Sequence, residues 1–198
     1  DPDGDSLAYS ITGGPDQAKL ELNATSGILS FKNPPDFENP NDANTDNLYE
    51  LTVQVSDGTA QPAQNMVVQV SNINESPVFT SSNAPSVFEN QTFIGELNAT
   101  DPENDNLAYS IAYGDDQALF DLNVATGALS FKTPPDFENP NDANTDNLYE
   151  LTVQVSDGEH NATLNLSVSV TGINEPPVFT SQPNLDMPEG QLVVGEVN

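Results

Sequence analysis

The sequence repeats itself with a period of 100 residues, and the two copies align without a gap. Of the 98 residue pairs in this register, 60 are identical, and residues 34–58 recur unbroken at 134–158. A fixed period is the signature of a tandem array, and this one has the length of an ordinary domain rather than of a small solenoid unit. We therefore expect modules that fold as domains and follow one another along the chain.

The phase of the repeat divides the chain into three parts. Residues 1–75 read as a repeat without its first strands, 76–175 as a complete repeat, and 176–198 as the first strands of a third. The chain ends in GEVN where the complete repeat reads GELNATD, and it starts at the equivalent aspartate. We expect either a window on a longer array or an end-to-end arrangement in which one molecule's tail completes the next molecule's head.

Apolar and polar residues alternate through most of the complete repeat. Every second residue is apolar in 148–156, 163–170 and 107–113, the last of these including Tyr113. A period of two is typical of strands with one buried face. No window carries an apolar stripe of helical period.

Further strands are predicted by shorter segments. FDLN at 120–123 and ALSF at 128–131 are separated by a glycine-containing connection, which indicates a hairpin. Residues 93–99 and 177–181 are also strand candidates. About seven strands in ~100 residues predict an all-β fold, a seven-stranded antiparallel β-sandwich of the immunoglobulin type with Greek-key connections.

The segment between Phe131 and Leu148 is rich in Pro, Asn and Asp, so we expect a surface loop there rather than a strand. Long ordered loops are more often functional than not. Its core, DFENPNDANTDN at 136–147, is identical to residues 36–47.

The charge balance excludes several classes of partner. The chain has 31 acidic and 3 basic residues, a net charge of −28, and no arginine. It therefore lacks the basic groove that nucleic acid requires, and it would be repelled by anionic membrane surfaces. No apolar run is long enough for membrane insertion. Cysteine is absent, so disulfides give no information about the compartment.

Clustered carboxylates repel one another unless something offsets the charge. Clusters that combine Asp, Glu and Asn oxygens suit a hard divalent cation, and calcium takes six to eight such ligands. The DANTD loop has this spacing, so Asp142, Asn144 and Asp146 are predicted to hold a separate calcium ion. The alternative for this loop, and for DPENDN and DPDGD, is ordinary turn chemistry.

Five motifs, in order, resemble those of cadherin-type repeats, particularly the bacterial cadherin-like variety. They are VFEN at 87–90, ATDPENDNLAYSI at 99–111, DFE at 136–138, VQVSDG at 153–158 and GINEPPVF at 172–179. The resemblance implies an extracellular location, at a cell surface or secreted, and calcium held at the junction between successive modules.

Carried over by position, the resemblance implies three sets of calcium ligands. The junction inside the chain would use Asp36, Glu38, Asn74, Glu75, Asp101, Glu103 and Asp157. The junction that leaves the complete repeat would use Glu89, Asp136, Glu138, Asn174 and Glu175. Asp1, Asp3 and Asp57 would face a module upstream.

The residues give no support for an enzyme. His160 is the only histidine and falls in a predicted turn, and there is no cysteine to act as nucleophile or zinc ligand. A glycosidase-like carboxylate pair would need a concave site that raises one pKa, for which the repeated loops give no sign.

Two functions fit the sequence. The first is a calcium-stiffened extracellular repeat that forms a rod, stalk or filament, with neighbouring repeats of the same protein as partners. The second is a polysaccharide-binding module. Sugar platforms present exposed aromatic rings, so an exposed row of Tyr or Phe on one sheet would favour the second function.

Overall fold

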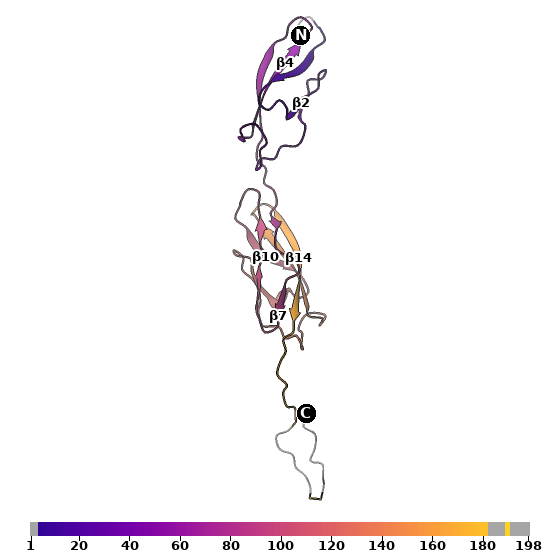
Figure 1. Ribbon diagram of the computed structural model, residues 1–198, viewed down its shortest axis with the longest axis vertical. Helices are drawn as coiled ribbons and strands as arrows, with labels where there is room; N and C mark the ends of the chain where they lie inside the picture. The colour runs from indigo at the N-terminus through magenta and orange to yellow at the C-terminus, as the bar shows by residue number, and fades with distance from the viewer. Residues whose placement is uncertain (1–3, 182–188, 191–198) are drawn as a thin grey trace. The chain divides into compact units, whose positions relative to one another are not determined.

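The computed structural model describes residues 4–181 and 189–190. The chain forms two compact units (Figure 1). The first unit contains residues 1–78 together with two loops from the second sequence repeat, 100–107 and 156–161. The second unit contains residues 79–99, 108–155 and 162–198. The first unit therefore differs from the sequence repeat 1–75 by residues 76–78 and by these two loops.

Two sheets build the second unit, and together they hold seven strands. The four-stranded sheet has the order β10 (Ala108–Tyr113), β13 (Leu148–Ser156), β14 (Asn161–Thr171) and β7 (Ser86–Phe88). The three-stranded sheet has the order β11 (Phe120–Leu122), β12 (Ala128–Phe131) and β8 (Phe93–Glu96). The predicted hairpin is confirmed, because β11 and β12 pair antiparallel. One helical turn, η1 (Gln117–Leu119), precedes β11.

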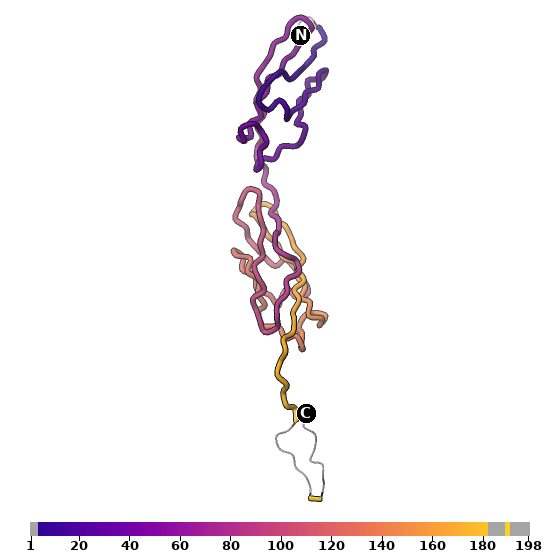
Figure 2. Tube along the Cα trace, viewed as in Figure 1, coloured from indigo at the N-terminus to yellow at the C-terminus, as the bar shows by residue number. Residues whose placement is uncertain are grey.

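One strand pair departs from the predicted antiparallel arrangement. Strand β7 runs parallel to β14, with Ser86 opposite Ser169. Figure 2 shows these two segments side by side. The reason is a change of sheet. A turn at Glu89 and Asn90 separates β7 from β8, which belongs to the other sheet, so β7 joins the first sheet beside its last strand.

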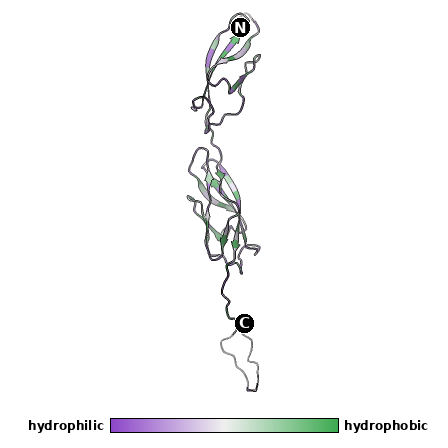
Figure 3. Ribbon diagram, in the orientation of Figure 1, coloured by the Kyte–Doolittle hydropathy of each residue, from purple (hydrophilic) through white to green (hydrophobic). Residues whose placement is uncertain are grey.

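The core of the second unit follows the predicted alternation along β13. Tyr149, Leu151, Val153 and Val155 are each at most 3% exposed. The ring of Tyr149 meets those of Phe120 and Phe131 edge-on. Figure 3 shows the hydrophobic residues concentrated on the strands. Burying each large apolar side chain stabilises the fold by about 1.5–3 kcal/mol, so this column is the main stabilising feature of the unit.

Two expectations about the strands are wrong. Tyr113, predicted on a buried face, is 59% exposed at the last position of β10. The adjacent Gly114 lies so close to the Leu151 backbone that a Cβ would be 2.4 Å from its Cα, so the chain must turn away there. Residues 177–181 form no strand, although their counterparts include β6 (Val78–Phe79). Strand β6 pairs with β9 (Ala99–Thr100), and no described segment pairs in this way with residues 177–181.

The first unit has a smaller set of strands. Strands β1 (Ala8–Gly13), β4 (Leu48–Ser56) and β5 (Ala63–Gln69) form one sheet, and β2 (Leu20–Leu22) pairs with β3 (Leu29–Phe31). Its core repeats that of the second unit, with Tyr49 and Leu51 buried on β4. Strand β5 is an edge in the described sheet, and Val67 on it is 57% exposed.

The long loops, which contain residues 36–47 and 136–147, are surface segments without strand, as predicted. A buried aspartate outside each loop holds it in place. One oxygen of Asp116 accepts the Ala143 N–H at 2.7 Å, and the other accepts the Glu150 N–H at 2.7 Å. Asp16 makes the same two bonds to Ala43 and Glu50. Each aspartate therefore ties the loop to the strand that follows it.

Candidate metal centre

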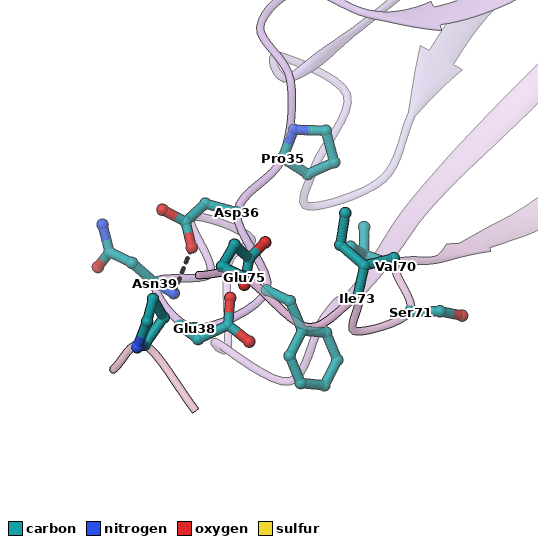
Figure 4. Close-up of a pocket in the computed structure, with 10 residues that line it drawn as sticks. Pro35, Asp36, Glu38, Asn39, Val70, Ser71, Ile73 and Glu75 are labelled. Atoms are coloured by element: carbon teal, nitrogen blue, oxygen red, sulfur yellow. Dashed lines mark hydrogen bonds between the residues drawn. The ribbon is translucent and has the colours of Figure 1, made fainter. Parts of the chain in front are cut away.

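Three glutamates converge within the first unit. Glu38, Glu75 and Glu103 each offer a carboxylate oxygen, and these oxygens all lie within 4.8 Å of one another. Figure 4 shows the carboxylates of Asp36, Glu38 and Glu75 gathered in one region. The structure thus brings together residues 38, 75 and 103, which were predicted to share one junction.

Local hydrogen bonds set the position of each acidic side chain. Asp36 accepts the Asn39 N–H at 3.0 Å and so fixes the turn that carries Glu38. Asp101 accepts the N–H groups of Glu103 and Asp105, both at 3.1 Å, and so shapes the loop that presents Glu103. These turn-type bonds arise because a short Asp side chain readily accepts N–H groups two to four residues ahead.

Two oxygens of this cluster, and one on the loop that carries Glu103, are buried without a hydrogen-bond donor. They are Glu75 Oε2, Glu103 Oε1 and Asp101 Oδ2, and no described residue satisfies them. A buried acceptor without a partner is unfavourable, and native structures rarely leave one. A cation held by the converging glutamates would satisfy the first two of these oxygens, so the donor set fits a metal ion.

The carboxylates also perturb one another. The contact between the carboxyl groups of Glu75 and Glu103, together with burial and the neighbouring negative charges, raises the pKa of Glu75 to about 7. Burial raises the pKa of Glu38 as well. For Glu103, burial acts in the same direction, but hydrogen bonds from Glu75, from its own backbone and from Glu38 together outweigh it and lower the pKa. Without a cation, the cluster therefore holds a shared proton near neutral pH.

This shared proton predicts a pH dependence in chelator. Because the pKa of Glu75 rises from 4.5 to about 7 on folding, the folded chain keeps a proton that the unfolded chain has released. The free energy of unfolding should therefore fall as pH rises from 4.5 to about 7. Urea unfolding in chelator across this window measures the slope, and Glu75→Gln should flatten it. A slope that is unchanged in Glu75→Gln would assign it to other groups.

Asn74 and Asp157 also meet, as the predicted junction requires. Asn74 Nδ2 donates to Asp157 Oδ2 at 2.9 Å and lies 2.8 Å from His160 Nδ1. The other oxygen of Asp157 accepts the N–H groups of Glu159 and His160. Burial opposes ionisation of Asp157, but these hydrogen bonds prevail and lower its pKa. Asp157 is thus held as a carboxylate by its own turn.

A second acidic group lies in the second unit. Glu89, Asp136 and Glu138 offer carboxylate oxygens within 4.8 Å of one another. Glu89 is buried, and its two oxygens accept the N–H groups of Ile173 at 2.7 Å and Phe137 at 3.0 Å. These backbone bonds lower the pKa of Glu89. Glu89 therefore also joins the acidic loop to the segment that follows β14.

The remaining predicted ligands are placed as follows. Asn174 and Glu175 are exposed. Burial is the largest cause that raises the pKa of Glu138, and the negative charge of Glu175 contributes to the rise. Asp57 accepts the N–H groups of Thr59 and Ala60 and caps the turn between β4 and β5. Asp1 and Asp3 lie outside the described residues.

The DANTD loop shows turn chemistry. Asp142 is buried, and its two oxygens accept the N–H groups of Asp146 and Asn147. Asn144 donates its side-chain N–H to Asp146. The bonds are those of an Asx turn, the alternative left open for this loop. A calcium ion on Asp142, Asn144 and Asp146 stays a prediction.

The sequence reasoning did not identify Asp16 and Asp116, the buried anchors of the acidic loops. Their neighbours, Pro15 and Asp115, give no sign of which residue is buried. The identity of D-Q-A at 16–18 and 116–118 was the only available signal.

Comparison with known families decides the fold family. The profile of the cadherin domain matches residues 83–171. These residues form a cadherin domain. They span nearly all of the complete repeat, including the turn that carries Glu89 and the loop that carries Asp136 and Glu138. The resemblance to cadherin repeats is confirmed, while its bacterial variety stays a prediction.

Curated cadherins are similar over most of the chain. The Fat-like cadherin-related tumor suppressor homolog of Drosophila melanogaster is 29% identical over 87% of the chain, and human protocadherin-15 is 31% identical over 98%. The chain spans only 4% and 10% of these two relatives. A crystal structure of human protocadherin-24 EC1-2 matches with a TM-score of 0.54 and 22% identity, covering 86% of this chain and 85% of that one.

These findings confirm the all-β sandwich and place residues 83–171 among cadherin domains, which are extracellular adhesion repeats rather than enzymes. In the described part of the chain, no helix has the length and apolar character needed to cross a membrane.

Proposed function

We propose that the first unit of this cadherin-type chain binds calcium through Glu38, Glu75, Asp101 and Glu103. The observation that carries the proposal is the group of buried oxygens on Glu75, Asp101 and Glu103 that have no donor among the described residues. Calcium would satisfy these oxygens and neutralise the repulsion that otherwise retains a proton on Glu75.

The donor set favours calcium over other cations. All the side chains that converge here offer oxygen, and calcium accepts carboxylates in a flexible geometry at ~2.3–2.6 Å, whereas magnesium demands a near-ideal octahedron and retains its waters. Zinc and copper prefer nitrogen or sulfur ligands, and the chain has one histidine and no cysteine. Asp36, Asn74 and Asp157 lie on the adjoining turns and would complete the shell or orient it.

Calcium at this position would join segments from two successive repeats. Glu38 and Glu75 belong to the first sequence repeat, whereas Asp101 and Glu103 belong to the second. An ion shared by both would restrict motion of the loops that carry them. Repeated along an array, this would stiffen successive repeats into a rod or stalk, with neighbouring repeats as the partners. The carboxylates of Glu89, Asp136 and Glu138, which offer oxygens within 4.8 Å of one another, would hold calcium with the repeat that follows.

The polysaccharide alternative gains no support from the exposed rings. Phe88 and Tyr113 lie on β7 and β10, the opposite edges of the four-stranded sheet, and Phe93 lies on the other sheet. Among the described residues, these rings form no row on one sheet. We therefore propose the calcium-linked structural role alone.

A calcium titration of the whole chain tests the proposal. Extracellular calcium modules bind with Kd of about 10⁻⁴–10⁻³ M. We expect calorimetry to detect binding in that range, and Glu75→Gln to weaken it because a carboxylate ligand is replaced by a neutral amide. Asp121→Ala, which removes an exposed charge on β11, is the matched control.

A further inference from the structure

The acidic loop of each unit ends in an asparagine whose backbone lies in the left-handed region. Asn47 has φ 63° and Asn147 has φ 64°. In the first unit, the backbone N–H of Asn47 donates to Asp42 Oδ1 at 3.2 Å, and the Asn47 carbonyl accepts the N–H of Val70 at 3.0 Å. The backbone of this asparagine is therefore bonded to the loop on one side and to the residue that follows β5 on the other.

The side chain of each asparagine bonds to the acidic segment at the start of the loop. Asn47 Nδ2 donates to the Phe37 carbonyl at 2.9 Å, and Asn147 Nδ2 donates to the Phe137 carbonyl at 3.0 Å. The opposite orientation of the amide would place two oxygens against each other, so the amide nitrogen must face the carbonyl. In each unit, one side-chain bond thus joins residues ten positions apart.

The other amide oxygen of each asparagine has no donor. Asn47 Oδ1 and Asn147 Oδ1 are buried, and no described residue donates to them. A buried acceptor without a partner is unfavourable. Glycine would adopt the same φ without strain and without such an oxygen, so backbone geometry alone does not explain asparagine at this position. What the asparagine side chain adds is its hydrogen bond to the phenylalanine carbonyl.

The carbonyl that accepts this bond lies between two candidate metal ligands. Phe37 stands between Asp36 and Glu38 in the sequence. Asp36 also accepts the N–H of Asn39 at 3.0 Å (Figure 4). Among the described residues, Asn47 is the only one whose side chain donates to a carbonyl of residues 36–39. The asparagine therefore ties the segment that carries both carboxylates to the start of β4.

The second unit makes the same bond beside its own acidic group. The N–H of Phe137 donates to Glu89 Oε2 at 3.0 Å, and its carbonyl accepts the bond from Asn147. Hydrogen bonds therefore hold Phe137 on both sides. The flanking carboxylates of Asp136 and Glu138 offer oxygens within 4.8 Å of each other and of Glu89. In both units, the asparagine bond accompanies a group of gathered carboxylates.

We propose that Asn47 is a positioning residue of the metal centre, whose amide orders the carboxylates of Asp36 and Glu38 before the cation binds. This inference rests on the proposed calcium binding. Asn47 acts through the Phe37 carbonyl rather than as a ligand. Loss of a group that orients metal ligands typically weakens metal affinity by about 10–100-fold. Asn147 takes the same role in the second unit.

This role explains why the DANTD loop is ordered without requiring an ion on it. Asp42 accepts the N–H groups of Asp46 and Asn47, and Asp16 accepts the N–H of Ala43. These bonds fix the end of the loop at which Asn47 lies. The two buried aspartates thus orient the asparagine, and the asparagine orients the candidate ligands.

An NMR calcium titration of the 198-residue chain, followed at the amides of Glu75 and Glu103, tests the inference. Asn47→Gly removes the side-chain amide and keeps the left-handed backbone, which alanine would strain. We expect Kd at these amides to rise by about tenfold or more. Asn147→Gly makes the identical change in the second unit and should leave this Kd unchanged.

Amide hydrogen exchange in chelator provides a readout that needs no calcium. Asn47→Gly should speed exchange several-fold at Asn39, whose N–H donates to Asp36, because the segment loses its bond to the loop. Thr45→Gly is the control within the same loop. Thr45 also has a positive φ, 59°, and its hydroxyl donates to the Asn44 carbonyl. This control should change neither the exchange at Asn39 nor the calcium Kd.

The outcomes separate this inference from the proposed function. Slow exchange at Leu51, which is buried on β4, reports that a variant is folded. If Glu75→Gln weakens calcium binding but folded Asn47→Gly binds as tightly as the unsubstituted chain, the inference is overturned and the proposed function stands. Unchanged exchange at Asn39 in Asn47→Gly would overturn it as well. If calcium shifts neither Glu75 nor Glu103 in the unsubstituted chain, the proposed function fails, and the positioning role fails with it.

Discussion

Calcium should raise the melting temperature of the first unit, by an amount that grows with calcium concentration. With free calcium about 100 times Kd, binding to the folded state adds about 2.7 kcal/mol to the free energy of unfolding. Each kcal/mol shifts Tm by roughly 4–8 °C for a domain of this size. We therefore expect a rise on the order of 10 °C or more between chelator and about 10 mM calcium, which is about 100 times a Kd of 10⁻⁴ M, measured by calorimetry on the whole chain.

The variants separate metal binding from general charge screening. Glu75→Gln with Glu103→Gln removes two ligands and also two repelling charges. This variant should be insensitive to calcium, yet it should unfold in chelator at a temperature no lower than that of the unsubstituted chain. Magnesium at equal ionic strength should give a much smaller rise, because it dehydrates reluctantly. An equal rise with magnesium, or an equal calcium effect in the variant, would speak against the site.

Asp116→Ala should destabilise the second unit strongly. The Asp116 side chain is 4% exposed and accepts N–H groups from both the long loop and strand β13. Its removal leaves the N–H groups of Ala143 and Glu150 without an acceptor. Hydrogen bonds to charged groups contribute about 1.5–3 kcal/mol each, so we expect a loss of roughly 3–5 kcal/mol in urea unfolding.

The neighbouring residue supplies the matched control for this prediction. Asp115 is exposed, and Asp115→Ala makes the same change in charge, so it should alter the free energy of unfolding by no more than about 0.5 kcal/mol. Asp16→Ala should reproduce the large effect in the first unit, where Asp16 bonds Ala43 and Glu50. Equal effects of Asp115→Ala and Asp116→Ala would show that charge, rather than anchoring, is responsible.

The strands with a clear period of two were predictable, because the alternation of apolar and polar residues indicates which side chains are buried. Tyr149, Leu151 and Val153 alternate with polar residues, and the structure buries all three. Tyr113 continued the same period but lies where β10 ends, and periodicity alone carries no information about where a strand stops. Thr152 is buried although it lies on the polar side, where it donates to Asn165.

Long-range features were harder to predict. The parallel pairing of β7 with β14 depends on a change of sheet that no local pattern marks. The anchoring role of Asp116 depends on contacts with residues 27 and 34 positions away. The convergence of Glu38, Glu75 and Glu103 was expected from the family resemblance rather than from spacing, since these residues are distant in the sequence. What local chemistry did indicate was the turn-forming use of Asp101 and Asp142, whose oxygens accept nearby N–H groups.

The calcium titration of the intact chain, compared with Glu75→Gln and Asp121→Ala, tests the central proposal most directly. We predict heat of binding with Kd in the range of about 10⁻⁴–10⁻³ M for the unsubstituted chain and for Asp121→Ala. Glu75→Gln should weaken the binding event assigned to the first unit and leave unchanged any event that belongs to Glu89, Asp136 and Glu138. Identical titrations for all three proteins would contradict a calcium site at the glutamate cluster.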